Sequence, residues 1–374
     1  MALNCGIVGL PNVGKSTIFQ ALSSAHAEVA NYPFCTINPN IGIVNVPDER
    51  LTKLADLFKP KRTVPAAIEF VDIAGLVKGA SKGEGLGNQF LGHIREVGII
   101  AQVVRCFDNP DVVHVDNKVN PQSDMETINI ELALADLDTL AKRRERAERT
   151  LKVQPAAEKK AAQVVLDALA KIAPALEDGK AARSVNLTDD ECAAIYDCHF
   201  ITLKPQLYVC NTDEDGIKTA AKGQPNDYIK AVQKRAADEG SCAVVICGKF
   251  EAELSEIEDI NEKKVFLEEL GLKEPGLVNL IHDAYKLLGL STFFTAGSDE
   301  CRAWTIRKGD TAPKAAGTIH SDFEKGFIKA EVYGYPDIVQ YGTEAKIKEA
   351  GKYRQEGKDY IVQDGDVIFF KFNV

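Results

Sequence analysis

The 374-residue sequence lacks any long hydrophobic run. No stretch of about 18 consecutive apolar residues occurs, although a membrane-spanning helix needs roughly that length. The N-terminus also lacks a basic start followed by an apolar segment, which is the pattern of a secretory signal. We therefore expect a cytoplasmic protein that does not have a membrane as a partner.

Positive charge is in deficit, because 45 lysines and arginines stand against 55 aspartates and glutamates and give a net charge of −10. A chain with this balance is not a generic binder of polyanions. We expect no DNA partner, and any contact with RNA must come from a local basic patch.

Paired cysteines are absent as well. The nine cysteines are scattered from Cys5 to Cys301, and none forms a CxxC motif. This spacing argues against a zinc clamp or a dithiol redox motif. The pattern is typical of free thiols in a reducing cytoplasm.

Short apolar runs alternate with amphipathic segments in the first part of the chain, as expected when parallel strands are separated by helices. The predicted strands are Cys5–Val8, Ile41–Val46, Ile68–Val71, Ile99–Phe107, Gln206–Cys210 and Ala243–Ile246. About 100 residues separate the fourth strand from the fifth, which is too long for an unstructured loop. We therefore expect an inserted segment there.

The inserted segment is predicted to be a helical hairpin over Met125–Lys180. Apolar residues recur there at spacings of three and four, at Ile130, Leu134, Leu137 and Ala141 and again at Ala162, Val165, Leu169 and Ile172. Between residues 142 and 160, eight lysines and arginines stand against three glutamates. This basic segment is a candidate RNA contact, and the alternative is a solvated helix face with Glu–Arg pairs at helical spacing.

The last part of the chain changes character at Thr292–Gly297 and becomes rich in glycine, threonine and aromatic residues. A helical stretch over Lys263–Leu288 precedes it. Predicted strands separated by turns follow at Ala303–Ile306, Phe327–Val332, Tyr360–Val362 and Val367–Phe370. A third, small and strand-rich domain is expected here.

Immediately after the first predicted strand, Gly9–Thr17 reads GLPNVGKST and matches the P-loop pattern GxxxxGK[ST] between a strand and a helix. Glycines let backbone N–H groups turn inward around phosphate oxygens, and the following helix adds its positive dipole end. Lys15 is expected to bridge the β- and γ-phosphates as a catalytic residue. The motif assigns nucleotide contacts to Asn12, Val13, Gly14, Lys15, Ser16 and Thr17.

A second motif, Asp72–Gly75 (DIAG), follows the strand Ile68–Val71 and matches the DxxG of switch-type P-loop proteins. Asp72 is expected to hold Mg²⁺, and the backbone N–H of Gly75 is expected to contact the γ-phosphate. Thr36 lies between the two motifs and is the natural second hydroxyl for the metal. The predicted Mg²⁺ ligands are therefore Ser16, Thr36 and Asp72.

The fifth predicted strand runs into Asn211–Glu214 (NTDE), at the place where guanine-binding proteins have NKxD. In that motif the aspartate accepts two hydrogen bonds from guanine. Here Thr212 replaces the lysine and Glu214 replaces the aspartate, so one extra methylene moves the carboxylate out of register. The sequence disfavours guanine and assigns base contacts to Asn211, Thr212 and Glu214.

Taken together, Gly9–Ser16, Asn31–Phe34, Asp72–Val77 and Asn211–Glu214 resemble the Obg-like ATPase family, which is the YchF family in bacteria. The resemblance extends along the whole chain. The segment 302–327 resembles that family's TGS domain, a ubiquitin-like β-grasp module. The resemblance implies an α/β fold: a Ras-like P-loop NTPase domain with an inserted α-helical hairpin (coiled coil) and a C-terminal β-grasp TGS domain. The corresponding domain bounds are 1–120 and 201–285, 121–200, and 289–372.

The same resemblance implies an enzyme that hydrolyses ATP in preference to GTP and associates with the ribosome, through its large subunit or as a whole, and with rRNA. A Ras-like glutamine is absent after DxxG, where Leu76 stands, and the resemblance assigns water positioning to His114. From the residues alone, a histidine between valines is more often a packed structural residue. Asn12 matches the position that holds K⁺ in potassium-dependent relatives.

Two alternatives stay open at this point. One is a GTPase switch of the Obg type, in which Glu214 or Asp213 contacts guanine after a loop adjustment. The other is an ATP-sensing adaptor that binds ribosomes or RNA without hydrolysis, as the apolar Leu76 suggests.

Overall fold

The computed structural model describes residues 3–24, 40–73, 86–110, 112 and 118–373. The chain forms two compact units, each assembled from two segments. The first unit comprises Met1–Gly42 and Glu69–Leu280, and the second comprises Ile43–Ile68 and Ile281–Val374. None of the described helices has the length and apolar character needed to cross a lipid bilayer.

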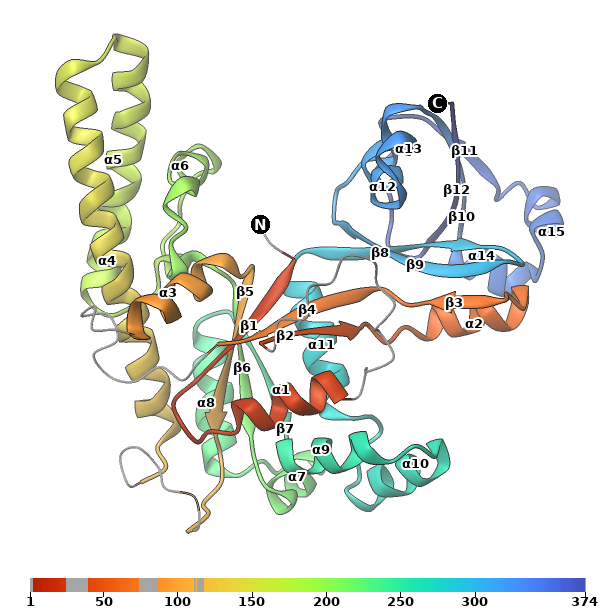
Figure 1. Ribbon diagram of the computed structural model, residues 1–374, viewed down its shortest axis with the longest axis horizontal. Helices are drawn as coiled ribbons and strands as arrows, with labels where there is room; N and C mark the ends of the chain where they lie inside the picture. The colour runs from red at the N-terminus through yellow and green to blue at the C-terminus, as the bar shows by residue number, and fades with distance from the viewer. Residues whose placement is uncertain (1–2, 25–39, 74–85, 111, 113–117, 374) are drawn as a thin grey trace. The chain divides into compact units, whose positions relative to one another are not determined.

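A six-stranded sheet in the order β2-β4-β1-β5-β6-β7 forms the centre of the first unit (Figure 1). Its strands are β1 (Asn4–Val8), β2 (Ile41–Asn45), β4 (Ala67–Asp72), β5 (Ile99–Arg105), β6 (Gln206–Asn211) and β7 (Cys242–Ile246). The pairs β1–β4, β1–β5, β5–β6 and β6–β7 are parallel. All six strands predicted in this part of the chain are therefore confirmed. Every residue of β5 and β6 is buried, as expected for central strands of a parallel sheet covered on both faces.

Helices connect these strands. In the first half they are α1 (Lys15–Ser24), α3 (Leu86–Glu96), α4 (Pro121–Val153) and α5 (Ala156–Glu177). After short segments η3 (Ala182–Ser184), α6 (Asp189–Ala194), η4 (Tyr196–Cys198) and η5 (Ile201–Leu203), the chain continues into α7 (Glu214–Ala221), α8 (Asp227–Asp238), α9 (Gly248–Glu256), α10 (Ile260–Glu269) and α11 (Gly276–Leu287). On the sheet, α8 packs against β6, β7 and α4, and α1 packs against α9.

The predicted hairpin is present as α4 and α5, which lie side by side and extend away from the sheet (Figure 1). Asn120 caps α4 by accepting a hydrogen bond from the backbone N–H of Ser123. The buried residues of α4 include Ala133, Leu140 and Ala147, whose spacing of seven is that of a coiled coil, and they pack on Ala162, Val165, Leu169 and Ile172 of α5. On α4 the predicted apolar face is partly wrong, because Ile130 and Leu134 are about 40% exposed.

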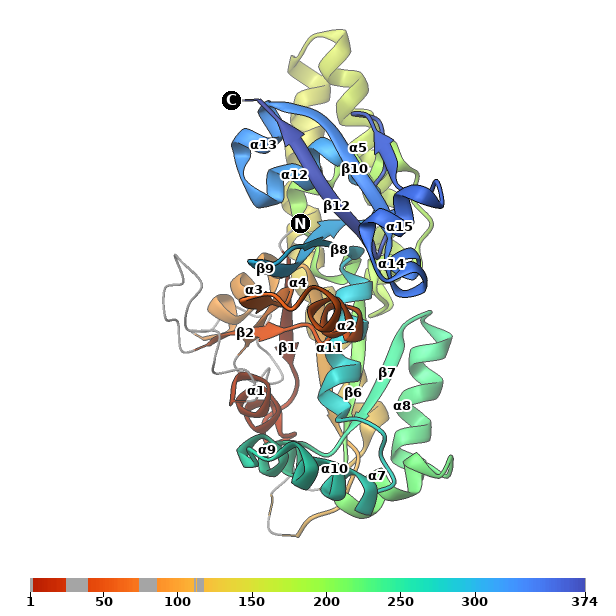
Figure 2. The same cartoon turned by 90° about the vertical axis from the view of Figure 1, so that its right-hand side faces the viewer.

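The second unit contains a mixed sheet in the order β11-β10-β12-β8-β9-β3. Its strands are β3 (Arg62–Val64), β8 (Leu290–Ala296), β9 (Glu300–Arg307), β10 (Phe327–Gly334), β11 (Arg354–Glu356) and β12 (Asp366–Phe372), and its remaining helices are α2 (Glu49–Phe58), α12 (Ala312–Ile319), α13 (Ser321–Lys325), α14 (Tyr335–Tyr341) and α15 (Glu344–Glu349). The hairpin β8–β9 is antiparallel, whereas β12 pairs parallel with β8. In Figure 2, α12 and α13 lie on one face of the strands β10 and β12. This arrangement is a β-grasp, as expected.

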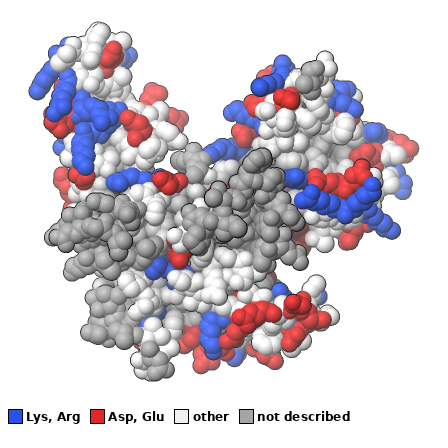
Figure 3. All heavy atoms as spheres, viewed as in Figure 1, with Lys and Arg blue, Asp and Glu red and all other residues white. Residues whose placement is uncertain are grey.

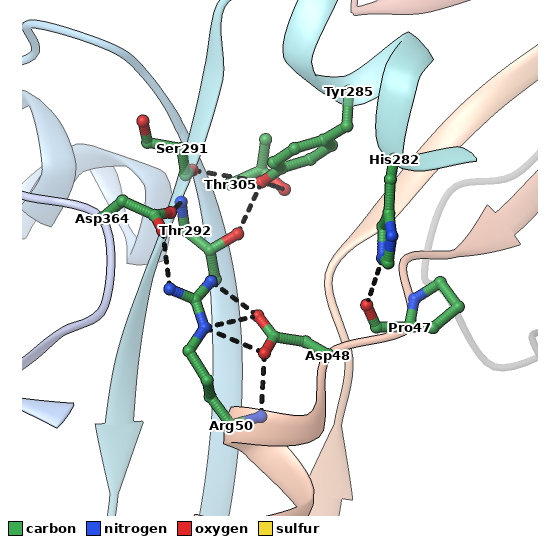
Figure 4. A network of polar contacts seen from close by, with 9 residues as sticks. All are labelled: Pro47, Asp48, Arg50, His282, Tyr285, Ser291, Thr292, Thr305 and Asp364. Atoms are coloured by element: carbon green, nitrogen blue, oxygen red, sulfur yellow. Dashed lines mark hydrogen bonds and ion pairs between the residues drawn. The ribbon is translucent and has the colours of Figure 1, made fainter. Parts of the chain in front are cut away.

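The segment Ile43–Ile68 belongs to the second unit, and polar contacts explain why (Figure 4). The guanidinium of Arg50, near the start of α2, contacts Asp48 at 2.8 Å and Asp364 at 2.6 Å. Asp364 also accepts a hydrogen bond from the backbone N–H of Thr292 at 2.8 Å. In addition, β3 pairs parallel with β9 at the edge of the sheet. The bounds predicted from the sequence do not separate this segment, and those bounds stay a prediction.

Two sequence-based elements differ from the structure. The predicted strand Tyr360–Val362 is wrong, since it forms only an isolated bridge between Ile361 and Thr311 before the chain turns at Gly365 (φ 89°). The predicted helical stretch Lys263–Leu288 is divided into α10 and α11. Gly271, with a φ of 71°, and Pro275 end the first helix and precede the second.

Candidate nucleotide-binding site

The loop between β1 and α1 has the backbone geometry of an anion-binding nest. Asn12 and Gly14 both have left-handed backbone conformations, with φ values of 61° and 93°. Such residues turn successive N–H groups toward one point, and the N-terminus of α1 begins directly after them at Lys15. A Cβ on Gly14 would lie 2.1 Å from the Nδ2 atom of Asn211, so only glycine fits here.

Lys15 lies inside this loop, with only 7% of its surface exposed. Its Nζ donates a hydrogen bond to the carbonyl oxygen of Leu10 at 2.8 Å. Burial lowers the pKa of Lys15, and the nearby carboxylate of Asp72 partly offsets this effect. The ammonium is thus held across the loop at the position where a bound triphosphate would need a cation.

Asp72 ends β4 and lies close to Lys15 and Ser16. Burial raises the pKa of Asp72, while the charge of Lys15 and a hydrogen bond from the Ser16 hydroxyl lower it in part. Its Oδ1 atom is buried and has no hydrogen-bond partner among the described residues. A carboxylate oxygen and a hydroxyl are the kind of ligands that Mg²⁺ accepts next to phosphate oxygens, so this donor set fits the metal.

Asn211, at the end of β6, joins two loops. Its Nδ2 donates to the carbonyl oxygen of Val13 at 2.8 Å, and its Oδ1 accepts from the backbone N–H of Gly248 at 3.0 Å. The side chain is 6% exposed. Both ends of the amide are therefore used to connect the P-loop with the start of α9.

The residues after Asn211 are already engaged in contacts within the protein. Thr212 is 2% exposed and donates its hydroxyl to the carbonyl oxygen of Cys106 at 3.3 Å. Asp213 caps α7 by accepting from the backbone N–H of Gly216 at 2.8 Å. Glu214 is more exposed, and one of its carboxylate oxygens lies 3.3 Å from the Nζ of Lys249.

A cavity of about 650 Å³ brings the P-loop and the predicted base-binding residues together. It is lined by Asn12, Gly14, Thr17, Phe107, Asp108, Asn109, Val112, Asn211, Thr212, Asp213, Glu214, Asp215, Cys247 and Lys249. Lys15 and Ser16 lie at the adjoining start of α1, whereas the side chain of Val13 is buried in the core. The predicted residues Thr36, Gly75 and His114 lie outside the described residues, as does Leu76.

Sequence reasoning missed the side of the cavity that follows β5. The guanidinium of Arg105, which is 1% exposed, donates to the carbonyl oxygens of Phe107, Asn109 and Val112 at 3.0–3.2 Å and lies over the ring of Phe107. Ligands of parallel sheets bind at the carboxyl ends of the strands, so the position of Phe107 just after β5 was the available signal. No pattern in the sequence indicated that Lys249 would line the cavity.

The first strand of the sheet carries a P-loop at its carboxyl end, and a cavity large enough for a base lies beside this loop. These features define a P-loop nucleotide-binding protein. The family model described as "50S ribosome-binding GTPase" matches residues 4–168, and the model YchF-GTPase_C, described as a protein of unknown function, matches residues 290–373. Proteins named "Ribosome-binding ATPase YchF" from Pasteurella multocida and Bacillus subtilis are each 54% identical over 374 residues, which is 100% of both chains. The chain therefore belongs to the YchF family.

Solved structures agree with this assignment. The Schizosaccharomyces pombe YchF GTPase has a TM-score of 0.87 at 37% identity and covers 99% of this chain and 97% of its own. A GTP-binding protein from Pyrococcus horikoshii has a TM-score of 0.59 at 17% identity, and this likeness concerns the fold alone. The relatives' names include both ATPase and GTPase, so the preferred base has to be argued from the site.

Proposed function

We propose that this protein is a ribosome-associated ATPase that binds and slowly hydrolyses ATP in preference to GTP, and that the bound nucleotide controls its contact with the ribosome. The phosphates bind to the P-loop from Asn12 to Thr17, and Lys15 neutralises charge that develops on them. Ser16, Thr36 and Asp72 hold Mg²⁺, which supplies further stabilisation of phosphate charge.

The preference for ATP is supported mainly by the contacts of the two acids that follow β6. Guanine recognition needs a carboxylate with both oxygens free to accept from the ring N–H and the exocyclic amine. Asp213 is already used as a helix cap, and Glu214 has one oxygen paired with Lys249. A carboxylate next to an ammonium presents one acceptor and one donor, which complements the exocyclic amine and N1 of adenine.

Hydrolysis needs a group that positions the attacking water, and we assign this role to His114, with Leu76 in place of the usual glutamine. The assignment follows the family resemblance; within the described residues, Arg105 holds the carbonyl oxygen of Val112, two positions earlier in the sequence, at 3.0 Å. Asn12 would in addition help to hold K⁺, so turnover is expected to be higher in potassium than in sodium. Equal hydrolysis rates in the two salts would contradict a role for K⁺ at Asn12.

The ribosome is the proposed partner because the relatives that match the whole chain are named as ribosome-binding proteins. The contact includes rRNA, and the protein acts in the cytoplasm, where ribosomes are. DNA is not a partner, consistent with the net charge of −10.

Calorimetric titration of the nucleotide-free protein with ATP and GTP, in Mg²⁺ and K⁺, tests the base preference. We expect ATP to bind at least about tenfold more tightly, which corresponds to about 1.4 kcal/mol. Equal or tighter GTP binding would favour the GTPase alternative. Single-turnover hydrolysis with ribosomes present separates the ATPase from a non-hydrolysing adaptor, and sedimentation of the protein with ribosomes tests the partner.

A further inference from the structure

A second polar pocket, of about 330 Å³, lies in the first unit at the foot of the helical hairpin. It is formed by α3, α4 and the short segment η4, and it is separate from the residues that line the nucleotide cavity. Its lining residues include four cations and two carboxylates: Arg95, Lys142, Arg143, Arg146, Asp138 and Asp197. The volume is at the lower end of the range for small ligand sites.

The two carboxylates are matched by two of the cations. Lys142 lies 2.7 Å from Asp138, one helical turn away on α4. Arg143 lies 3.4 Å from Asp197 of η4. Within the described part of the chain, Arg95 and Arg146 form no ion pair at contact distance, so the pocket has a net positive charge.

Arg95 is held in place on the pocket wall by contacts from several elements. Its Nη2 donates to the hydroxyl of Thr139 at 3.1 Å, and the Nζ of Lys204 donates to the carbonyl oxygen of Arg95 at 2.9 Å. The buried Asp136 also interacts with Arg95 electrostatically. Asp136 already accepts hydrogen bonds from Ile201 and Thr202, with distances of 2.7–2.9 Å. The backbone of Arg95 is therefore held by Lys204 and its guanidinium by Thr139, with no ion pair to Arg95 among the described residues.

Arg143 also keeps unused hydrogen-bonding capacity. Only 21% of its side chain is exposed, its pairing distance to Asp197 is long, and its Nε has no acceptor among the described residues. Three guanidinium groups thus converge on one small pocket. Forked guanidinium donors match the oxygens of a phosphate better than they match a neutral ligand.

Basic side chains continue from the pocket along α4. Lys142, Arg146 and Arg149 recur at i, i+4 and i+7 and so share one side of the helix, over a rise of about 10 Å. Figure 3 shows lysine and arginine side chains gathered on the hairpin in this view. A chain of phosphates could follow this side, whereas a single small anion would use the pocket alone.

We propose that the pocket formed by Arg95, Arg143 and Arg146 binds a backbone phosphate of RNA. The inference rests on the proposed association with the ribosome, and it identifies the part of the hairpin that contacts the nucleic acid. The neighbouring Lys142 and Arg149 contact adjacent phosphates less specifically, since each is paired with an acid one turn away.

Fluorescence anisotropy with a fluorescein-labelled RNA hairpin as the probe tests this site in the full-length protein. We expect Arg95→Gln and Arg146→Gln each to weaken binding about fivefold or more and to reduce the slope of log K against log salt by about 1. Arg144→Gln is the matched control, because Arg144 is exposed on the same helix but does not line the pocket. It should change the affinity less than about twofold.

Several outcomes would overturn the proposal. Equal losses for Arg144→Gln and Arg146→Gln would mean that diffuse surface charge, not the pocket, binds RNA. Arg95 contacts Thr139, so thermal unfolding checks the fold of that variant, and Arg146, which is exposed, gives a second test without this difficulty. If inorganic phosphate binds in calorimetry and Arg146→Gln abolishes this binding while RNA affinity is unchanged, the pocket takes a small free anion instead.

Failure of the proposed function is measured separately. If the wild-type protein does not sediment with ribosomes but its RNA affinity depends on Arg95 and Arg146, the ribosome assignment fails and the phosphate pocket stands. If the wild-type protein sediments with ribosomes and the two variants bind RNA and ribosomes as the wild type does, the phosphate pocket is wrong and the ribosome assignment stands.

Discussion

Replacing Asn211 with alanine should weaken nucleotide binding by separating the P-loop from the start of α9, which follows β7. The substitution removes the donor to the carbonyl oxygen of Val13 and the acceptor for the N–H of Gly248, at 2.8 and 3.0 Å. An unsatisfied buried group costs about 1–3 kcal/mol, so the two together cost about 2–6 kcal/mol in the assembled site. A loss of 2 kcal/mol alone corresponds to about a 30-fold lower affinity.

Calorimetry with ATP and with GTP is the informative assay, because a residue that joins two loops affects both nucleotides equally. We expect the two affinities to fall by the same factor in Asn211→Ala. Asn211→Asp is the matched variant, since it retains an acceptor for Gly248 but places a carboxylate oxygen against the Val13 carbonyl. It should bind both nucleotides at least as weakly as the alanine variant does.

Two results would refute this reasoning. If the loss were confined to one nucleotide, Asn211 would act through the base and not through the loops. If neither affinity changed while thermal unfolding remained cooperative, the two hydrogen bonds would not contribute to the organisation of the site.

Three other predictions follow from the same structure. Lys249→Ala frees the second oxygen of Glu214 and should raise GTP affinity relative to ATP about three- to tenfold in parallel titrations; an unchanged ratio would contradict the proposed role of the pair. Burial raises the pKa of Glu251 from 4.5 to about 7 against backbone hydrogen bonds from Gly276 and Leu277, so its ionised form is the less stable one in the fold. The neutral carboxyl of Glu251 therefore contributes about 3 kcal/mol to the free energy of unfolding; this contribution is complete below pH 4.5 and is lost as the pH rises through 7. Urea unfolding at pH 5.5 and 8.5 measures this loss, which should be absent in the Glu251→Gln variant. His114→Ala should reduce single-turnover hydrolysis about a hundredfold or more with nearly unchanged ATP affinity, and an unaltered rate would exclude His114 from the chemistry.

Local patterns made the central sheet and the P-loop predictable. Each strand of the sheet is a short apolar run between turns, and the requirement for Gly14 follows from backbone geometry that any P-loop shares. The β-grasp was expected from family resemblance. Its strand pattern alone led to one error, because Tyr360–Val362 has strand-like residues but only a single bridge.

Long-range contacts could not be predicted from the sequence. Lys249 lies 35 positions after Glu214, and nothing in either local pattern indicates that their side chains meet. The strand β3 is only three residues long and pairs with β9, which lies more than 200 positions later in the chain. The role of Arg105 is similar, since a buried arginine at the end of a largely apolar strand indicates a partner but does not identify the carbonyl groups of the next loop.

The nucleotide cavity and the phosphate pocket are connected through β5 and α3 within one unit. Arg105 ends β5 at the nucleotide cavity, whereas Lys204 holds the carbonyl oxygen of Arg95 just before β5 begins. A change in the position of β5 or α3 on nucleotide binding would therefore alter the placement of Arg95. Coupling of this kind is typically five- to 150-fold and is reciprocal, so ATP should change RNA affinity by the same factor by which RNA changes ATP affinity. Anisotropy titrations with and without saturating ATP measure this factor directly. A factor of one in the wild-type protein would show that the two sites act independently, and a factor that persists in Arg95→Gln would place the coupling elsewhere.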